Sequence, residues 1–265
     1  MLGLVMVAGV VAISLLAPYL ATHDPTAVNI AERFQPPSYE HYFGTDDLGM
    51  DIYSRVLYAG LYDLSVGLIV LAVSTSIGTI VGIVAGYYGG KTDEALMRLS
   101  DIFLSCPGLI LAMGFSAAFK SRSLQVLVFA IALHQWPSYA RLVRGQVLTV
   151  KENQYIEAAR AIGAGSWSIL IGHILPNTIS PIIVNGTLDT GAIILTAATL
   201  SFIGLGTPPG IPEWGRMVAE GRMYIQSYPW IIIWPGLMIL ITVLGLNLLG
   251  DGLRDILDPR ARMRT

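Results

Sequence analysis

Residues 157–176 read EAARAIGAGSWSILIGHILP, and this stretch decides how the rest of the chain is interpreted. It lies in a polar, basic interruption between two apolar runs that are too long for a small soluble core. Apolar or small residues (Ile156, Ala159, Ile162) alternate with charged ones (Glu157, Arg160) as on a short amphipathic helix. The pattern therefore predicts a surface helix between two membrane-spanning segments.

The composition supports a membrane protein. The 265 residues are 54% hydrophobic and 13% charged, with a mean hydropathy of +0.62, whereas a soluble domain carries about 25% charged residues. A membrane helix needs about 20 mostly apolar residues. Six stretches fit, with Asp189 as their one charged residue: 1–21, 64–90, 102–119, 123–140, 174–212 and 223–250. We predict an all-α polytopic membrane protein with six transmembrane helices.

Two local features refine these helices. Gly78, Gly82 and Gly86 recur every four residues, a spacing that lets helices approach closely in a membrane. Cys106-Pro107-Gly108 predicts a kink in the third span, because proline removes a backbone donor and clashes with the preceding turn.

Several function classes are disfavoured. The net charge of −2 gives no indication of nucleic-acid binding, and a single cysteine, Cys106, excludes an internal disulfide. Residues 85–92 fit a relaxed phosphate-loop pattern, but they end a membrane helix and do not follow a buried strand, so we reject nucleotide binding there. Hydrolase and zinc-peptidase motifs are not found, and we predict neither a catalytic residue, a cofactor nor a metal. Energy for transport must come from another chain or from an ion gradient.

The distribution of basic residues predicts the orientation. With both termini in the cytoplasm, ten Lys and Arg residues fall in inner segments and six in outer segments. Residues 1–21 lack the basic start of a signal peptide and are expected to remain as a helix. The missing basic start also suggests that the numbering begins inside a longer natural sequence. We divide the chain into a first helix (1–21), an extracytoplasmic segment (22–62) and a core of five helices (63–265) with an inner loop (141–176).

The outer segments carry the next candidates. Asp46, Asp47 and Asp51 lack the alternating spacing of a calcium loop, so capping of turns is the favoured interpretation. Short helices are expected over 52–57 and 213–223, the second beginning with Glu213 and Trp214. Residues 39–51 and 208–223 are too long for simple turns. We therefore predict that they form a docking surface for a binding protein, or a gate, to which these residues belong: Asp46, Asp47, Asp51, Glu213 and Trp214.

Asp189 is the single acidic residue deep within a predicted span. A carboxylate in a membrane is costly and marks a functional site by default, here the translocation path. The alternative is a buried polar tie to Ser, Thr or Asn, with Asn185 and Thr190 already close in sequence. The sequence does not choose between them. His134 is interpreted as a packing or interface residue.

The inner loop also has two interpretations. Small residues at Ala158, Ala159 and Gly163 leave room for a partner's groove, and Glu157 and Arg160 offer charge-assisted contacts at its edge. Alternatively, the segment is an ordinary connector on the membrane surface. The residue pattern alone leaves both open.

The stretch quoted first resembles the EAA signature of bacterial ABC-importer permeases. Gly163 and Leu175-Pro176 fall in register with that signature, while His173 stands where it has isoleucine. The resemblance covers nearly the whole chain and points to the second permease subunit of the peptide/nickel class, the dipeptide and oligopeptide C-type subunits. Its further pieces are 43–49, 85–90, 139–144, 157–177, 200–206, 212–215, 250–255 and 258–260. Met50 and Ala197 depart from it, at positions where arginine and an acidic residue are usual.

The resemblance implies the type I importer permease fold in the cytoplasmic membrane. It implies a heterodimer with a homologous permease, two ATPase subunits below and a substrate-binding protein outside. Glu157, Ala158, Ala159, Arg160 and Gly163 would couple the chain to an ATPase. The expected cargo is a dipeptide or oligopeptide, with a nickel chelate or another small solute as the alternative, because the binding protein sets most of that choice. An ion-gradient-driven transporter is the rival class, although Asp189 alone gives it little support.

Overall fold

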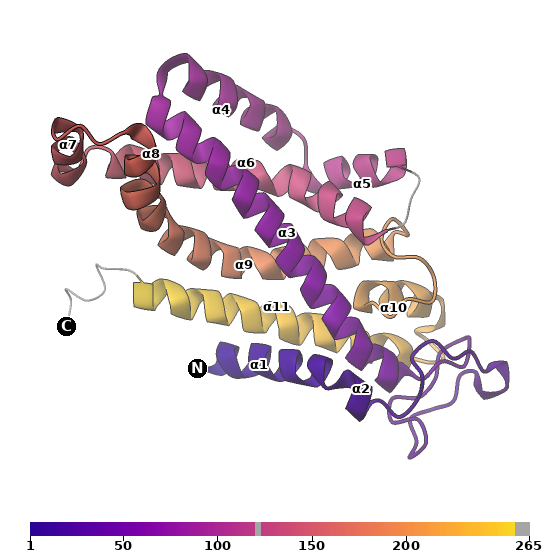
Figure 1. The fold of residues 1–265 in the computed structure, drawn as a ribbon. Helices are drawn as coiled ribbons and strands as arrows, with labels where there is room; N and C mark the ends of the chain where they lie inside the picture. Colours follow the sequence, from indigo (N-terminus) through magenta and orange to yellow (C-terminus); the bar gives the residue numbers. More distant parts are fainter. Residues whose placement is uncertain (120–122, 258–265) are drawn as a thin grey trace.

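The computed structural model describes residues 1–119 and 123–257, whose regular elements are all helical (Figure 1). The first are α1 (Leu2–Leu15), α2 (Ala17–Leu20), η1 (Ile30–Glu32), α3 (Ile52–Tyr88), α4 (Gly90–Leu104), α5 (Gly108–Phe119) and α6 (Leu124–Val150). Then follow α7 (Gln154–Ala161), α8 (Ser166–Ile169), the π-helical turn η2 (Leu170–Ile174), α9 (Leu175–Phe202), α10 (Trp214–Gly221), η3 (Arg222–Tyr224) and α11 (Trp230–Leu257). The described ranges contain no β-strand, so the all-α prediction is confirmed.

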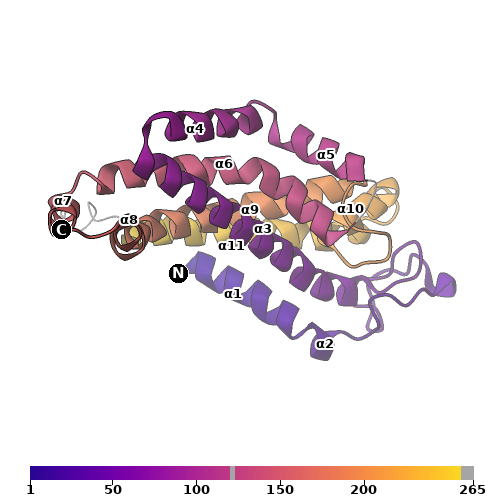
Figure 2. The same cartoon turned by 45° about the horizontal axis from the view of Figure 1, so that its top comes forward.

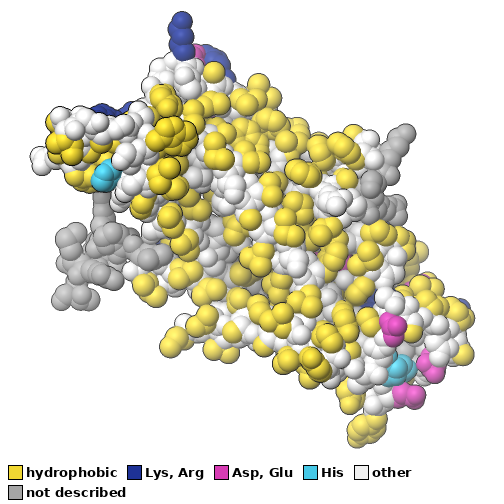
Figure 3. Space-filling model, in the orientation of Figure 1, with side chains coloured by type: hydrophobic (Ala, Val, Ile, Leu, Met, Phe, Trp, Pro, Cys, Tyr) yellow, Lys and Arg dark blue, Asp and Glu magenta, His cyan; other side chains and the backbone are white. Residues whose placement is uncertain are grey.

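The predicted spans correspond to α1, α3, the α4–α5 pair, α6, α9 and α11. Residues 52–88, 166–202 and 230–256 are long and apolar enough to cross a membrane, and α4 with α5 qualifies as a bent pair. α1 is a shorter apolar helix of 14 residues, and the 27 residues of α6 run past the predicted end at Ala140. Hydrophobic side chains cover the face seen in Figure 3. They lie between a basic end near α4 and the opposite end, which carries acidic and histidine side chains.

The predicted short helix over 52–57 is not a separate element, because α3 runs unbroken through it. Asp51 starts α3 by accepting a 2.8 Å hydrogen bond from the Ser54 N–H. Asp63 made the apolar pattern look interrupted, but its carboxylate is buried and accepts a 3.0 Å bond from the Trp214 N–H. The boundary placed after residue 62 therefore falls inside this helix.

The third predicted span is broken more sharply than a kink. α4 and α5 meet at 83° around the Cys106-Pro107-Gly108 sequence. Pro107 lacks the N–H that a continuing helix needs, and it restricts Cys106 to extended conformations. At the other end of α4, Gly89 and Gly90 have φ of +66° and +55° and turn the chain back from α3.

The predicted close approach of a glycine-lined helix is confirmed between α3 and α6. A Cβ on Gly78 would lie 2.4 Å from the Tyr139 Cβ, and one on Gly82 would lie 2.5 Å from the Ala140 carbonyl oxygen. No side chain fits at such distances, so the two backbones are in direct contact. This contact fixes α6 across α3 and so positions the segments at both ends of the bundle (Figure 2).

The two ends of the bundle differ. The start of α1, the end of α11 and α7 lie toward one end, and α2, α10 and the segment before α3 lie at the other (Figure 1). We call these the inner and outer ends. The resembling sequence 258–260 lies outside the described residues.

Candidate functional site

The inner end presents α7 on a base made by the same chain. Ile156 is fully buried and Ala159 is 9% exposed, and both pack against Val143, Val147 and Ile174 of α6 and η2. Of the predicted coupling residues, Ala159 therefore holds α7 in place, while Glu157, Ala158, Arg160 and Gly163 are exposed. The apolar face of α7 is therefore packed against the chain's own helices, and its exposed face is free for a partner.

Gly163 ends α7 in a specific hydrogen-bonded cap. The Gly163 N–H donates to the Arg160 carbonyl and the Ala164 N–H donates to the Ala159 carbonyl, both at 3.0 Å. This is the Schellman arrangement, which needs a left-handed residue after the helix. Gly163 has φ of +85°, a conformation that glycine adopts without steric cost. The glycine is thus required by the backbone, and a Cβ there would meet no atom of this chain within 4 Å.

Polar contacts tie this inner segment to α3 and α4. The Lys151 Nζ donates a 3.0 Å bond to the Gly86 carbonyl, and the Arg160 guanidinium lies 5.8 Å from the centre of the Tyr87 ring. Arg144 forms a two-pronged ion pair with Asp93, at 2.5 and 2.6 Å. These contacts therefore hold the segment that carries α7 against the inner ends of α3 and α4.

At the outer end, the aspartates cap the backbone. The Asp46 Oδ1 accepts bonds of 2.9 Å from the N–H groups of Leu48 and Met50. Burial raises the pKa of the Asp46 carboxyl, although the nearby Arg55 opposes this shift. Asp51 caps α3, so both carboxylates have the turn-capping role that the spacing favoured. Asp47 is half-exposed and is the one of the three that a docked protein could touch readily.

Glu213 and Trp214 are placed differently from a docking surface. They are 1% and 0% exposed, so neither side chain can touch a docked protein in this arrangement. The Trp214 Nε1 donates a 3.0 Å bond to the Val56 carbonyl, and Glu213 accepts a 2.8 Å bond from the Thr207 hydroxyl. Trp214 attaches α10 to α3, and Glu213 attaches the start of α10 to the loop that follows α9. Aromatic and apolar side chains that are exposed at this end include Tyr39, Tyr42, Leu48, Met223 and Ile225.

Asp189 has a partner that the sequence did not suggest. Its carboxylate accepts a 2.6 Å hydrogen bond from the Tyr139 hydroxyl of α6, while Asn185 and Thr190 donate to carbonyls of α9. Asp189 is half-buried, so the bond satisfies the carboxylate without enclosing it. The alternative of a tie to Ser, Thr or Asn named a different partner, because a tyrosine on the neighbouring helix supplies the donor.

A cavity of about 420 Å³ opens beside this position. Its walls come from α5, α6 and α9 and include His134, Gln135, Thr196 and Thr199. The lining residues of α9 include Ala192, Thr196 and Thr199, which follow Asp189 at intervals of three and four residues and so share one face of this helix. A water occupies about 30 Å³, so this cavity, with walls that are partly polar and partly apolar, has room for several. His134 packs against Gly108, in keeping with its interpretation as a packing residue, and it also lines this cavity. Ala197 is in the apolar core.

The outer end also brings together three possible metal ligands. One atom each of His23, His41 and Asp51 lies within 4.8 Å of the others. The sequence pattern did not indicate this group, because it does not show that His23 and His41 meet in the fold. Two of the four histidines in the chain fall in one outer segment, which was the available signal.

Comparison with known proteins identifies the family. Residues 78–263 match the family described as binding-protein-dependent transport system inner membrane component. Residues 1–37 match the N-terminal TM domain of oligopeptide transport permease C.

Curated relatives cover most of the chain. It is 46% identical over 245 residues to the probable D,D-dipeptide transport system permease protein DdpC of Escherichia coli K12, covering 92% of this chain and 82% of that one. It is 36% identical to the oligopeptide transport system permease protein OppC of Bacillus subtilis, covering 99% and 86%. A solved structure of the MetNI methionine ABC transporter matches with a TM-score of 0.63 at 19% identity, over 78% of this chain and 98% of that one. That likeness concerns the fold.

Proposed function

Because this chain belongs to the binding-protein-dependent transport system inner membrane components, we propose that it forms half of the translocation path of an ATP-driven peptide importer. Its relatives are named as permeases for dipeptides and oligopeptides, which supports peptide as the cargo. The partners would be a homologous permease, two ATPases and an extracytoplasmic binding protein. The observation that carries the proposal is the exposed face of α7, mounted on the chain's own helices.

Coupling would follow from how α7 is attached. An ATPase that grips Glu157, Ala158 and Arg160 pulls on a helix whose other face is packed against α6 and η2. Because packed helices move as units, a shift of α7 is passed to α6 and α9 rather than absorbed by a loose loop. Arg160 would contribute both its contact with Tyr87 and a charge for the partner.

The path would run along the faces of α5, α6 and α9 that line the polar cavity. Asp189 lies on that face of α9, held by Tyr139 and still half-exposed. A carboxylate there can attract the amino terminus of a peptide, and its bond to Tyr139 supplies a competing partner that keeps the attraction weak. Passage requires such weak binding, because a tightly held cargo would not leave.

The binding protein would dock on the outer segments through exposed residues such as Tyr39, Tyr42, Asp47 and Met223. Both termini would then lie in the cytoplasm, since the start of α1 and the end of α11 point toward the α7 end (Figure 1). The Arg and Lys residues near α4, α6 and α7 agree with this orientation.

Deletion of this chain tests the proposal. Uptake of a labelled dipeptide should be lost in the deletion strain, return with the chain, and stop when ATP is depleted. Parallel arms with a longer peptide and with Ni²⁺ distinguish the cargo. If uptake of both peptides is unchanged by the deletion while Ni²⁺ uptake is lost, the peptide assignment is wrong and the importer assignment remains.

Contact with the ATPase has its own test. A cysteine at exposed Ala158 should cross-link to an ATPase subunit in membranes, and one at Glu94, exposed on α4, serves as the matched control. Equal cross-linking at both positions, or none at Ala158 in an actively transporting complex, would contradict the coupling role of α7.

A further inference from the structure

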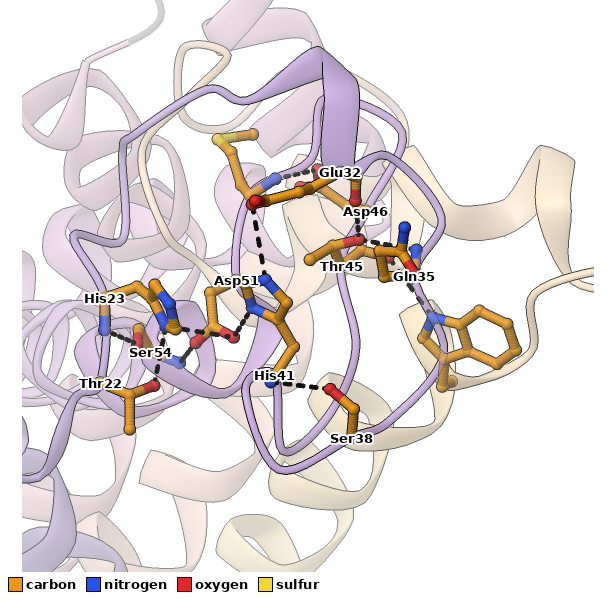
Figure 4. A network of polar contacts seen from close by, with 12 residues as sticks. Thr22, His23, Glu32, Gln35, Ser38, His41, Thr45, Asp46, Asp51 and Ser54 are labelled. Carbon is orange, nitrogen blue, oxygen red and sulfur yellow. Dashed lines mark hydrogen bonds and ion pairs between the residues drawn. The ribbon is translucent and has the colours of Figure 1, made fainter.

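Three residues from separate segments converge at the outer end (Figure 4). His23 follows α2, His41 lies in the loop before α3, and Asp51 is the N-cap of α3. The Asp51 Oδ1 is 2.9 Å from the His41 Nδ1 and 3.8 Å from the His23 Nδ1. The two imidazole rings lie 4.6 Å apart, centre to centre. Two ring nitrogens and one carboxylate oxygen therefore lie within 4.8 Å of one another.

Two of the three residues are buried, and one nitrogen is unsatisfied. His41 is 5% exposed and Asp51 is 2% exposed. The His41 Nε2 is buried and has no hydrogen-bond partner, with the nearest carboxylate oxygen, Oε2 of Glu32, at 3.6 Å. A buried polar atom without a partner is uncommon in folded proteins, and this one lies on the Glu32 side of the ring, away from the nitrogen that faces Asp51.

We propose that His23, His41 and Asp51 bind a divalent transition-metal ion of the zinc class. Zinc binds imidazole nitrogens at about 2.0–2.1 Å in tetrahedral sites, which puts neighbouring ligand atoms about 3.3 Å apart. The observed separations from the Asp51 Oδ1, 2.9 and 3.8 Å, lie on either side of that value. Two imidazoles and one carboxylate also favour zinc-class ions over calcium or magnesium, which prefer oxygen ligands alone.

The surroundings are compatible with a metal. The other oxygen of Asp51 stays on the Ser54 N–H at 2.8 Å, so metal binding keeps the cap of α3. With the Nδ1 of His41 on the metal, its Nε2 carries the proton and needs an acceptor, and Glu32 is placed to become one after a small movement. Carboxylates that orient a ligating histidine in this way are a regular part of zinc sites. The Thr22 hydroxyl, 3.0 Å from the His23 Nδ1, would give up that contact, and water would complete the coordination.

A metal here would clamp the outer segment. The ligands come from the end of the first helix pair, from the long loop and from the start of α3, which only the fold brings together. The ion would therefore fix the segment 21–51 on the helix below it. This role is independent of the cargo and of the ATPase contact.

The test uses the full chain purified in detergent with an affinity tag that contains no histidine. Zn²⁺ is titrated in competition with a chromophoric chelator, and Co²⁺ is used as a spectroscopic probe of tetrahedral coordination. We expect one ion per chain, tetrahedral Co²⁺ bands and a higher Tm with Zn²⁺. His23→Ala and His41→Ala should abolish binding, and Glu32→Gln should weaken it about 10-fold. His173→Ala, at the other end of the molecule, is the matched control and should bind as the wild type does.

The proposal is overturned if the wild-type chain takes up no stoichiometric Zn²⁺ at micromolar concentration. It is equally overturned if one ion per chain still binds after His23→Ala. Since His41 is buried and its replacement can disturb folding, His23, whose side chain is 37% exposed, is the deciding variant. Loss of binding in His173→Ala to the same extent would also reject the assignment.

Discussion

Replacing Gly163 with alanine isolates the role of the α7 cap. An L-residue in the left-handed region costs about 1–2 kcal/mol, and the φ of +85° at Gly163 lies in that region. One to two kcal/mol shifts an equilibrium by about 5- to 30-fold, so the capped form of the loop should become less populated by up to this factor. No atom lies within 4 Å of the added Cβ, so the effect comes from the backbone rather than from collision within the chain.

The assay is peptide uptake per ATP hydrolysed by the assembled transporter in vesicles. Gly163→Ala should lower this ratio while leaving assembly intact, and Gly163→Asn should restore most of it, because asparagine tolerates the left-handed conformation. Gly165→Ala is the matched control, with φ of −69° and open space around its Cβ. If Asn is worse than Ala, bulk against the ATPase decides, and the backbone argument is refuted. Wild-type coupling in Gly163→Ala would refute it as well.

Three more predictions follow from other contacts. Gly82→Ala places a Cβ 2.5 Å from a backbone oxygen of α6 and should cost about 1–3 kcal/mol, seen as a lower Tm, whereas Gly114→Ala, with open space, should not lower it; equal melting temperatures would contradict the backbone contact. Asp189→Asn should reduce peptide transport while assembly and basal ATP hydrolysis persist, and Tyr139→Phe should strengthen cargo retention by freeing the carboxylate; if Asp189→Asn transports normally and Asp189→Leu prevents assembly, Asp189 is a structural tie. Burial raises the pKa of Glu213 to about 7 from 4.5, so its contribution to stability is fully present below pH 4.5 and is lost as the pH rises towards 7; thermal melts across this range should show the decline, and Glu213→Gln should flatten it.

The sequence predicted the helices better than their joints. Apolar run length, which reflects the thickness of the bilayer, located the helices that correspond to the six predicted spans; α3, the α8–α9 segment, α11 and the bent α4–α5 pair are long and apolar enough to cross a membrane. It started the second span too late, at residue 64, because Asp63 interrupts the apolar run, although a contact with α10 buries Asp63 inside α3. The bend at Pro107 was anticipated in place but not in size, because proline chemistry excludes a straight helix without fixing an angle.

The candidate sites divide in the same way. The short helix at Gln154–Ala161 followed from periodicity, and capping by the Asp46 carboxylate followed from turn chemistry. Burial of Trp214 and the partner of Asp189 did not, because each depends on a contact with a distant helix. The pairing of His23 with His41 is of this kind too, since a chain pattern carries no information on which loops meet.

α3 differs in one respect from the other long helices, α6, α9 and α11. Its 37 residues contain no proline, whereas α6 and α11 each contain one and α9 contains two, Pro176 and Pro181. At 1.5 Å per residue it is about 55 Å long, well beyond the thickness of the hydrocarbon layer. One end is anchored by Asp51 beneath the outer segment, and the other receives Lys151 next to α7. A continuous helix of this kind couples the two sides of the membrane. When one end of α3 is displaced, the whole helix tilts and its other end moves too, whereas bending is expected in the proline-containing helices around it.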